Sequence, residues 1–138
     1  MKLSGLSELD EKSFFAFLDQ KTVQLAALLP LPDSSGPNWG AARKVISIYF
    51  RLCAMNKDVN SEFDLSSIEP FLEVPLDSEV IKGIDKQEGT AHAKTFRIRT
   101  LTPFRNTEFQ ALAKRIAVQK GLHRYELDVL YWNRLSDA

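Results

Sequence analysis

The sequence predicts an all-α protein, a compact single domain of about six helices that spans residues 1–138. Apolar side chains recur at the spacing of amphipathic helices over most of the chain, and the alternation typical of a strand is confined to residues 96–101. Prolines, glycines and polar residues separate the helical stretches. With 138 residues, of which 44% are apolar and 26% are charged, the chain is long enough to bury its own core.

The first helical stretch is predicted over residues 8–29, as one helix or two. Ser7 and Asp10 have the spacing of a capping box, in which each side chain bonds a free backbone amide. Pro30 and Pro32 end the helix, because proline disfavours helical geometry in the residue before it. A turn-rich connector follows, up to Trp39.

The second helix is predicted from Gly40 to Met55 and is expected to be the buried centre of the domain. It carries two apolar rows, Val45–Tyr49–Leu52 and Ile46–Phe50–Cys53. Its polar face carries Lys44, Ser47 and Arg51. Cys53 is the only cysteine, so no disulfide forms within the chain, and its apolar neighbours predict a buried, inert thiol.

The middle of the chain predicts short elements joined by polar loops. Residues 56–63 are expected to be a loop, after which Asp64 caps a short helix. Asp77 is predicted to cap a helix over residues 78–84, because an aspartate before a helical pattern accepts a first-turn amide. A polar loop is predicted from residue 85 to 94.

The C-terminal part predicts two more helices after a short extended piece at residues 96–101. Thr107 is expected to cap an amphipathic helix that Gly121 ends, and a last helix is predicted over residues 124–134. The region before them is locally basic, with Lys94, Arg97, Arg99 and Arg105.

Charge and motif content limit the possible functions. Lysine and arginine number 18, as do aspartate and glutamate, so a nucleic-acid-binding surface would have to be local. The sequence has no signal-peptide pattern and no membrane-length apolar run, so a cytoplasmic protein without a membrane partner is expected. It has no phosphate-binding loop, dinucleotide fingerprint or zinc pattern, and neither a cofactor nor a metal site is predicted.

One stretch has the pattern of a phosphate-binding turn. Residues 36–45 read GPNWGAARKV, a glycine-flanked turn that enters a helix. The amides of such a turn and the positive end of the helix dipole favour a phosphate. The residues predicted to bind nucleic acid are therefore Gly36, Trp39, Gly40 and Arg43.

Together with VPLDSEV at residues 74–80, this stretch resembles the helix-hairpin-helix DNA glycosylase superfamily, and the resemblance extends at low identity over residues 20–135. The element similar to the family's hairpin covers residues 20–56. In the family, a lysine at the start of the hairpin helix is the Schiff-base nucleophile, and an aspartate opens a later helix. The resemblance implies Lys44 and Asp77 as the catalytic pair of a DNA N-glycosylase and lyase, with DNA as partner.

Simpler interpretations of the same residues stay open. Asp77 can be a helix cap alone, Lys44 a solvated surface lysine and Trp39 a core residue. The alternative function is a non-enzymatic helical module that binds a partner protein or itself as a homo-oligomer. A Lys44 side chain that points into a pocket beside Asp77 would favour the enzyme, and one in open solvent would favour the module.

Overall fold

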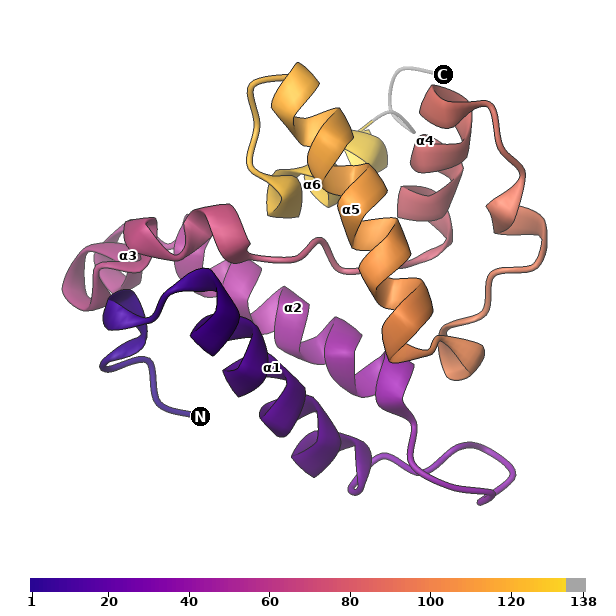
Figure 1. Ribbon diagram of the computed structural model, residues 1–138, viewed down its shortest axis with the longest axis horizontal. Helices are drawn as coiled ribbons and strands as arrows, with labels where there is room; N and C mark the ends of the chain where they lie inside the picture. Colours follow the sequence, from indigo (N-terminus) through magenta and orange to yellow (C-terminus); the bar gives the residue numbers. More distant parts are fainter. Residues whose placement is uncertain (134–138) are drawn as a thin grey trace.

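The computed structural model describes residues 1–133 and has the predicted all-α architecture, with α-helices and 3₁₀ turns over more than half of the chain (Figure 1). The α-helices are α1 (Glu11–Ala26), α2 (Trp39–Met55), α3 (Lys57–Phe63), α4 (Ser78–Glu88), α5 (Pro103–Gln119) and α6 (Leu127–Asn133). The 3₁₀ turns are η1 (Leu6–Glu8), η2 (Leu65–Ser67), η3 (Glu69–Phe71), η4 (His92–Lys94), η5 (Ile98–Thr100) and η6 (Arg124–Glu126). Within residues 1–133, no helix is both long enough and apolar enough to cross a membrane.

The helices form two halves joined by a buried connector, residues 72–77 (Figure 1). The first half, α1 to η3, has a core centred on Phe14, Ile46 and Phe50. The second half, α4 to α6, has a core centred on Ile81, Ile84 and Ile116. The halves pack against each other through α2, which contacts η5 and η6. Tyr125 of η6 is buried in the core of the first half, so the two cores are linked.

The connector has no helical structure, yet Leu72, Glu73, Val74 and Leu76 are all buried. Buried backbone groups need hydrogen-bond partners. The side-chain amide of Gln110 on α5 supplies them: its Oε1 accepts from the Val74 amide at 3.0 Å, and its Nε2 donates to the Val74 carbonyl at 2.8 Å. The Gln110 side chain thus makes the two backbone hydrogen bonds that a neighbouring strand would make with Val74.

In the first half, α1 begins at Asp10, whose carboxylate accepts the Ser13 amide at 2.8 Å. The predicted capping box is wrong, because Ser7 lies in η1 and Asp10 itself is the cap. Phe14 and Phe50 pack edge to face with ring centroids 5.7 Å apart and fix α1 on α2.

In the second half, Asp77 caps α4 as the sequence predicts, and its Oδ1 accepts the Val80 amide at 2.9 Å. The helix continues to Glu88, beyond the predicted end at residue 84. Gly83 faces the ring of Tyr131, and a Cβ at that position would lie 2.6 Å from ring carbons. The glycine therefore allows α6 to pack closely on α4.

Residues 57–63 form helix α3, where the sequence predicts a loop. The Asn56 side chain accepts the amides of Asp58 and Val59, each at 3.1 Å, and so caps a helix that is otherwise polar. Asp64 stands at the N-cap position of η2, as predicted, but its side chain accepts no backbone amide there. It has φ 51°, in the left-handed region, and ends α3.

The predicted extended piece at residues 96–101 is wrong, because η5 occupies residues 98–100. Helix α5 begins earlier than predicted. Thr102, followed by Pro103 in the first turn, caps it in place of Thr107. The last predicted helix is divided into η6 and α6, and its predicted end at Arg134 lies outside the described residues.

The burial of α2 differs from the prediction in one respect. The row of Ile46 and Phe50 is buried, but Val45 and Leu52 of the other row are 49% and 57% exposed. Cys53 is half-buried. The supposed polar face instead points toward the second half, where Ser47 is buried and Arg51 pairs with the buried Asp128 of α6. From sequence alone, a polar helix face that pairs with charges of another helix cannot be distinguished from a face that is exposed to solvent.

The core of the first half gives a stability prediction. Phe50→Ala removes a fully buried ring and should lower the free energy of unfolding by about 3–5 kcal/mol. Val45→Ala, on the exposed side of the same helix, should change it by less than about 0.5 kcal/mol. Urea unfolding followed by circular dichroism measures both. Equal effects of the two substitutions would contradict the assigned orientation of α2.

Candidate functional site

The predicted phosphate-binding turn lies at the start of α2. The Leu31 amide donates to the Gly36 carbonyl at 2.9 Å and closes the turn. Asn38 caps α2 by accepting the Ala41 amide at 3.2 Å, and no acidic residue lies in the first turn. No carboxylate in the first turn therefore neutralises the positive end of the helix dipole at the N-terminus of α2.

Gly40 lies where η5 crosses the start of α2. A Cβ on Gly40 would lie 2.0 Å from the Ile98 carbonyl oxygen and 3.0 Å from the Cβ of Leu101. Only glycine allows the backbone of η5 to come this close. Gly40 thus has a packing role that fixes η5, and with it Arg99, beside the start of α2.

Trp39 and Arg43 both point inward. Trp39 is half-buried and packs against the core of the second half, and the Arg43 guanidinium lies 5.4 Å from the centre of its ring. The structure thus places Trp39 at the edge of the core. Arg43 is only 4% exposed, although the sequence placed it among the phosphate-binding candidates.

Arg43 is the centre of a buried hydrogen-bond network. Its Nε and Nη2 donate to the two carboxylate oxygens of Glu73 at 2.8 and 3.1 Å. Its Nη1 donates to Asp19 and to the Thr22 hydroxyl, each at 2.9 Å. Burial opposes the charge on Arg43, but Glu73 and Asp19 outweigh it and raise the pKa of the guanidinium. Asn106 of α5 completes the network by donating to Glu73 at 3.2 Å.

Lys44 and Asp77, the implied catalytic pair, make no hydrogen bond or ion pair with each other. Lys44 is half-buried and lines a small space that it shares with Leu76, the residue before Asp77. Among the described residues, the Lys44 ammonium has no ion-pair or hydrogen-bond partner. The Asp77 carboxylate is engaged on both sides, since Oδ1 caps α4 and Oδ2 accepts the Trp132 indole N–H at 3.3 Å.

The space that Lys44 lines is too small to hold a water molecule, and Val74, Leu76, Ile98 and Leu101 are among the other residues that line it. A flipped nucleobase therefore has no cavity at Lys44 in this conformation.

The locally basic stretch forms an exposed cationic surface, which we call the basic segment surface: Lys94, Arg97 and Arg99, with the neighbouring Arg105. Lys94, Arg97 and Arg99 are exposed, whereas Arg105 pairs with Glu108 at 2.7 Å. Arg99 lies across a cavity of about 390 Å³ from Asp33 of the turn before α2. In Figure 1 this segment runs down beside the start of α2.

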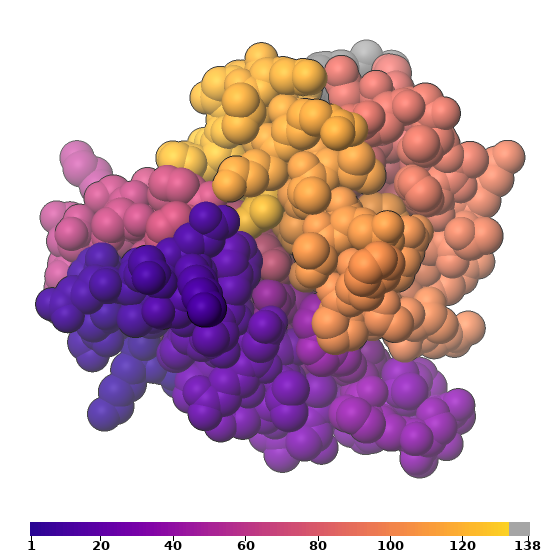
Figure 2. Space-filling view, viewed as in Figure 1, coloured from indigo at the N-terminus to yellow at the C-terminus, as the bar shows by residue number. Residues whose placement is uncertain are grey.

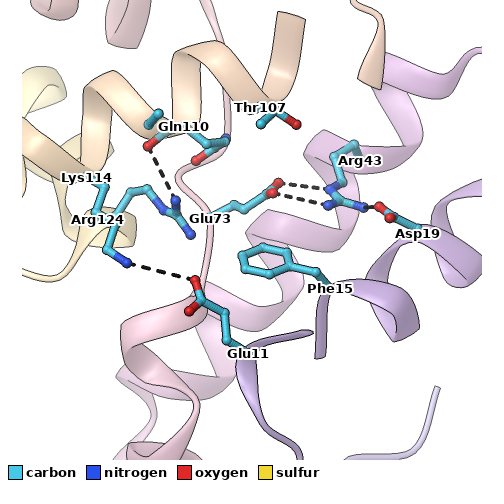
Figure 3. A pocket seen from close by; sticks show the side chains of 10 residues that line it. Glu11, Phe15, Asp19, Arg43, Glu73, Thr107, Gln110, Lys114 and Arg124 are labelled. Carbon is cyan, nitrogen blue, oxygen red and sulfur yellow. Dashed lines mark hydrogen bonds and ion pairs between the residues drawn. The ribbon is translucent and has the colours of Figure 1, made fainter. Parts of the chain in front are cut away.

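A further hollow, with several charged side chains, lies elsewhere, in a groove of about 330 Å³ between α1 and α5 (Figure 2). Its walls are Glu11, Phe15 and Asp19 on α1 and Thr107, Ala111 and Lys114 on α5, and its floor is Arg43, Glu73, Gln110 and Arg124 (Figure 3). Sequence reasoning did not single out Glu73 or Arg124. The available signal was a lone glutamate inside the apolar run FLEVPL, since a charge in such a run needs a partner when buried.

Arg124 holds the connector to α5 from the floor of this groove. Its guanidinium donates to the carbonyls of Leu72 at 3.1 Å, Phe71 at 2.8 Å and Gln110 at 3.3 Å. Burial lowers the pKa of Arg124, and the neighbouring charge of Glu73 only partly offsets this. An arginine nevertheless stays protonated in proteins.

The buried network gives a second prediction. Glu73→Ala leaves the Arg43 charge buried without its main partner and should lower the free energy of unfolding by about 3–5 kcal/mol. Glu108→Ala also breaks a glutamate–arginine pair, but both side chains are more than 40% exposed. That control should cost about 1 kcal/mol or less. Chemical denaturation measures both, and equal effects would show that burial of the Arg43–Glu73 pair is unimportant.

Comparison with known proteins gives no further assignment. No protein-family model matches the chain, and neither a curated protein nor a solved structure is similar to it. Within residues 1–133, no three His, Cys, Asp or Glu side chains are grouped so that they could hold a metal ion. The function is therefore inferred from the contacts and charges described above.

Proposed function

We propose that the protein binds nucleic acid, in the manner of a helix-hairpin-helix protein, through the turn before α2 and the basic segment surface. The observation that supports this most is the close approach of Gly40 to the Ile98 carbonyl, which sets the segment against the start of α2. The exposed Arg99 then lies beside the turn before α2, whose first turn has no acidic residue, and the exposed Lys94 and Arg97 precede Arg99 in the chain. Both features attract a phosphate backbone.

Local charge supports the proposal despite the zero net charge of the chain. Lys94, Arg97 and Arg99 make no ion pair within the described part of the chain. Asp33 is the counter-charge on this face. Hydrogen bonds from Ser35 are the main cause that lowers the pKa of Asp33, and Arg99 contributes to the shift. Arg43 does not contact phosphate in this proposal, because its donors are occupied inside the protein.

The proposed activity is binding without base excision. A lyase lysine must be deprotonated and face the sugar of a flipped nucleotide. Lys44 instead lines a space that is too small for a water molecule, and the oxygens of Asp77 already accept hydrogen bonds from Val80 and Trp132.

The binding proposal is tested by salt-dependent affinity for a short DNA duplex, measured by fluorescence anisotropy. The double variant Arg97→Ala/Arg99→Ala should weaken binding and make the slope of log K against log salt shallower by about 2. Asp33→Asn should strengthen binding, because it removes the acid opposite Arg99 and keeps an acceptor for the Ser35 amide. Lys57→Ala/Lys120→Ala, with the same loss of charge at exposed sites outside this face, is the control. Binding that responds alike to both double variants would refute the proposed surface.

The absence of lyase chemistry is tested with borohydride and DNA that contains an abasic site. We expect no covalent adduct at Lys44, since the space that it lines is too small for a nucleotide. Lys44→Ala should therefore leave DNA affinity within about twofold of the unchanged protein, as expected of a residue outside the phosphate contacts. A trapped adduct that disappears in Lys44→Ala would reverse this conclusion and establish the catalytic pair.

One observation favours the alternative, a module that binds a protein or a second copy of itself. Val45, Leu52 and Met55 leave an exposed apolar stripe on α2, at helical spacing. Such stripes are common at protein interfaces. Sedimentation of the chain over a range of concentrations separates the two functions, because an interface between copies would give a concentration-dependent mass that Leu52→Glu abolishes.

A further inference from the structure

The groove between α1 and α5 has the size and composition of a small-molecule site. Its volume of about 330 Å³ falls in the range of ligand pockets, and its lining combines apolar surface with a few convergent polar groups. Figure 2 shows it as a hollow between the indigo surface of α1 and the orange surface of α5. It lies on the other side of α5 from Arg105 and Phe109, which face the basic segment.

The two buried arginines on the floor of the groove differ in their partners. Arg43 pairs with two carboxylates, those of Glu73 and Asp19, whereas Arg124, only 8% exposed, has no ion-pair partner among the described residues. The three hydrogen-bond partners of Arg124 are neutral carbonyls. A guanidinium has five N–H donors, so part of its donor capacity is left for a further acceptor. The burial of Arg124 opposes its charge, the nearby charges of Glu73 and Glu11 offset this only in part, and an anion in direct contact would offset more of it.

The mouth of the groove carries a second cation that is available to a ligand. The Lys114 ammonium lies 3.9 Å from Glu11, in a pair whose side chains are about half exposed. Exposed pairs of this kind contribute little to stability, so Lys114 can exchange Glu11 for a ligand at small cost. Lys114 and Arg124 both line the groove (Figure 3).

The remaining walls indicate what the rest of a ligand would contact. The Phe15 ring lies 6.0 Å from the Arg124 guanidinium and gives a flat apolar surface, and Ala111 leaves open space on α5. Asp19 uses one carboxylate oxygen for Arg43, and its side chain is 67% exposed. That carboxylate can accept a hydrogen bond from the other end of a ligand.

From this arrangement we infer that the groove binds a small molecule with a carboxylate or phosphate monoester group, which Arg124 and Lys114 hold, and with an apolar part against Phe15. The site is separate from the proposed nucleic-acid surface and does not depend on it.

The test is a titration of the isotope-labelled chain with inorganic phosphate and, separately, with acetate, followed by amide NMR at constant ionic strength set with chloride. We expect saturable shifts at Phe15, Ala111 and Lys114. Saturation by phosphate alone assigns a phosphate monoester, and saturation by acetate assigns a carboxylate. No saturable shift at these amides with either anion would overturn the inference.

Two variants show whether the response comes from the groove. Ala111→Trp fills the open space from an exposed position and should abolish the response while the melting temperature stays unchanged. Lys114→Gln should weaken binding by about tenfold or more, as the loss of a charge-assisted hydrogen bond does. Lys120→Gln, an equally exposed lysine just after α5 that does not line the groove, is the matched control and should leave binding unchanged.

Two outcomes with these variants would contradict the inference. A response that persists in Ala111→Trp would mean that the anions bind elsewhere. A loss of duplex DNA affinity in Ala111→Trp would make the groove part of the nucleic-acid surface, and the small-molecule site would then be wrong. The basic segment lies on another side of α5 from the groove. If the protein fails to bind DNA, the anion titration therefore still tests the groove.

Discussion

The buried pair between Arg43 and Glu73 links the parts of this fold that are most distant in sequence. Arg43 belongs to α2, Glu73 to the connector and Asn106, which also bonds Glu73, to α5. Removing two charges from water costs free energy, and their mutual attraction offsets that desolvation only when the geometry is good and further hydrogen bonds are made. Here both conditions hold, because the pair is bidentate and Thr22, Asp19 and Asn106 take up the remaining groups. Such a network accepts one relative placement of α1, α2 and α5, and the groove follows from that placement.

Capping residues made some helix boundaries predictable from the sequence, whereas other boundaries could not be predicted. Asp77 was recognised as a cap because an aspartate before a helical pattern has one dominant use. Thr107 was mistaken for a cap because the sequence offers two threonines, and only the Pro103 beside Thr102 distinguishes the true one. Helix α3 was missed since its stability comes from the Asn56 cap and from packing at its ends, while its own surface is polar. Periodicity cannot detect such a helix.

The candidate site was harder to predict than the fold, because the direction of a side chain depends on tertiary contacts. Arg43 stands near the start of α2, where a phosphate contact and an internal ion pair look identical in sequence. The partner that decides between them, Glu73, is 30 residues away. The glycine-flanked turn makes Gly40 a phosphate-binding candidate, whereas its described contact is with the Ile98 backbone. In both cases the surroundings of the residue could not be inferred from spacing.

The buried connector also determines how the molecule can move. Domain closure needs a hinge, usually a few loop residues that absorb a change in φ and ψ. Residues 72–76 are the only covalent link between the halves, but Gln110 holds Val74 from both sides and Arg124 holds Leu72. A segment tied in this way cannot act as a hinge without losing its buried hydrogen bonds. These hydrogen bonds therefore oppose hinge motion between the halves, and they hold the two walls of the groove in place, so that a ligand of the proposed site would lose little affinity to ordering of the protein.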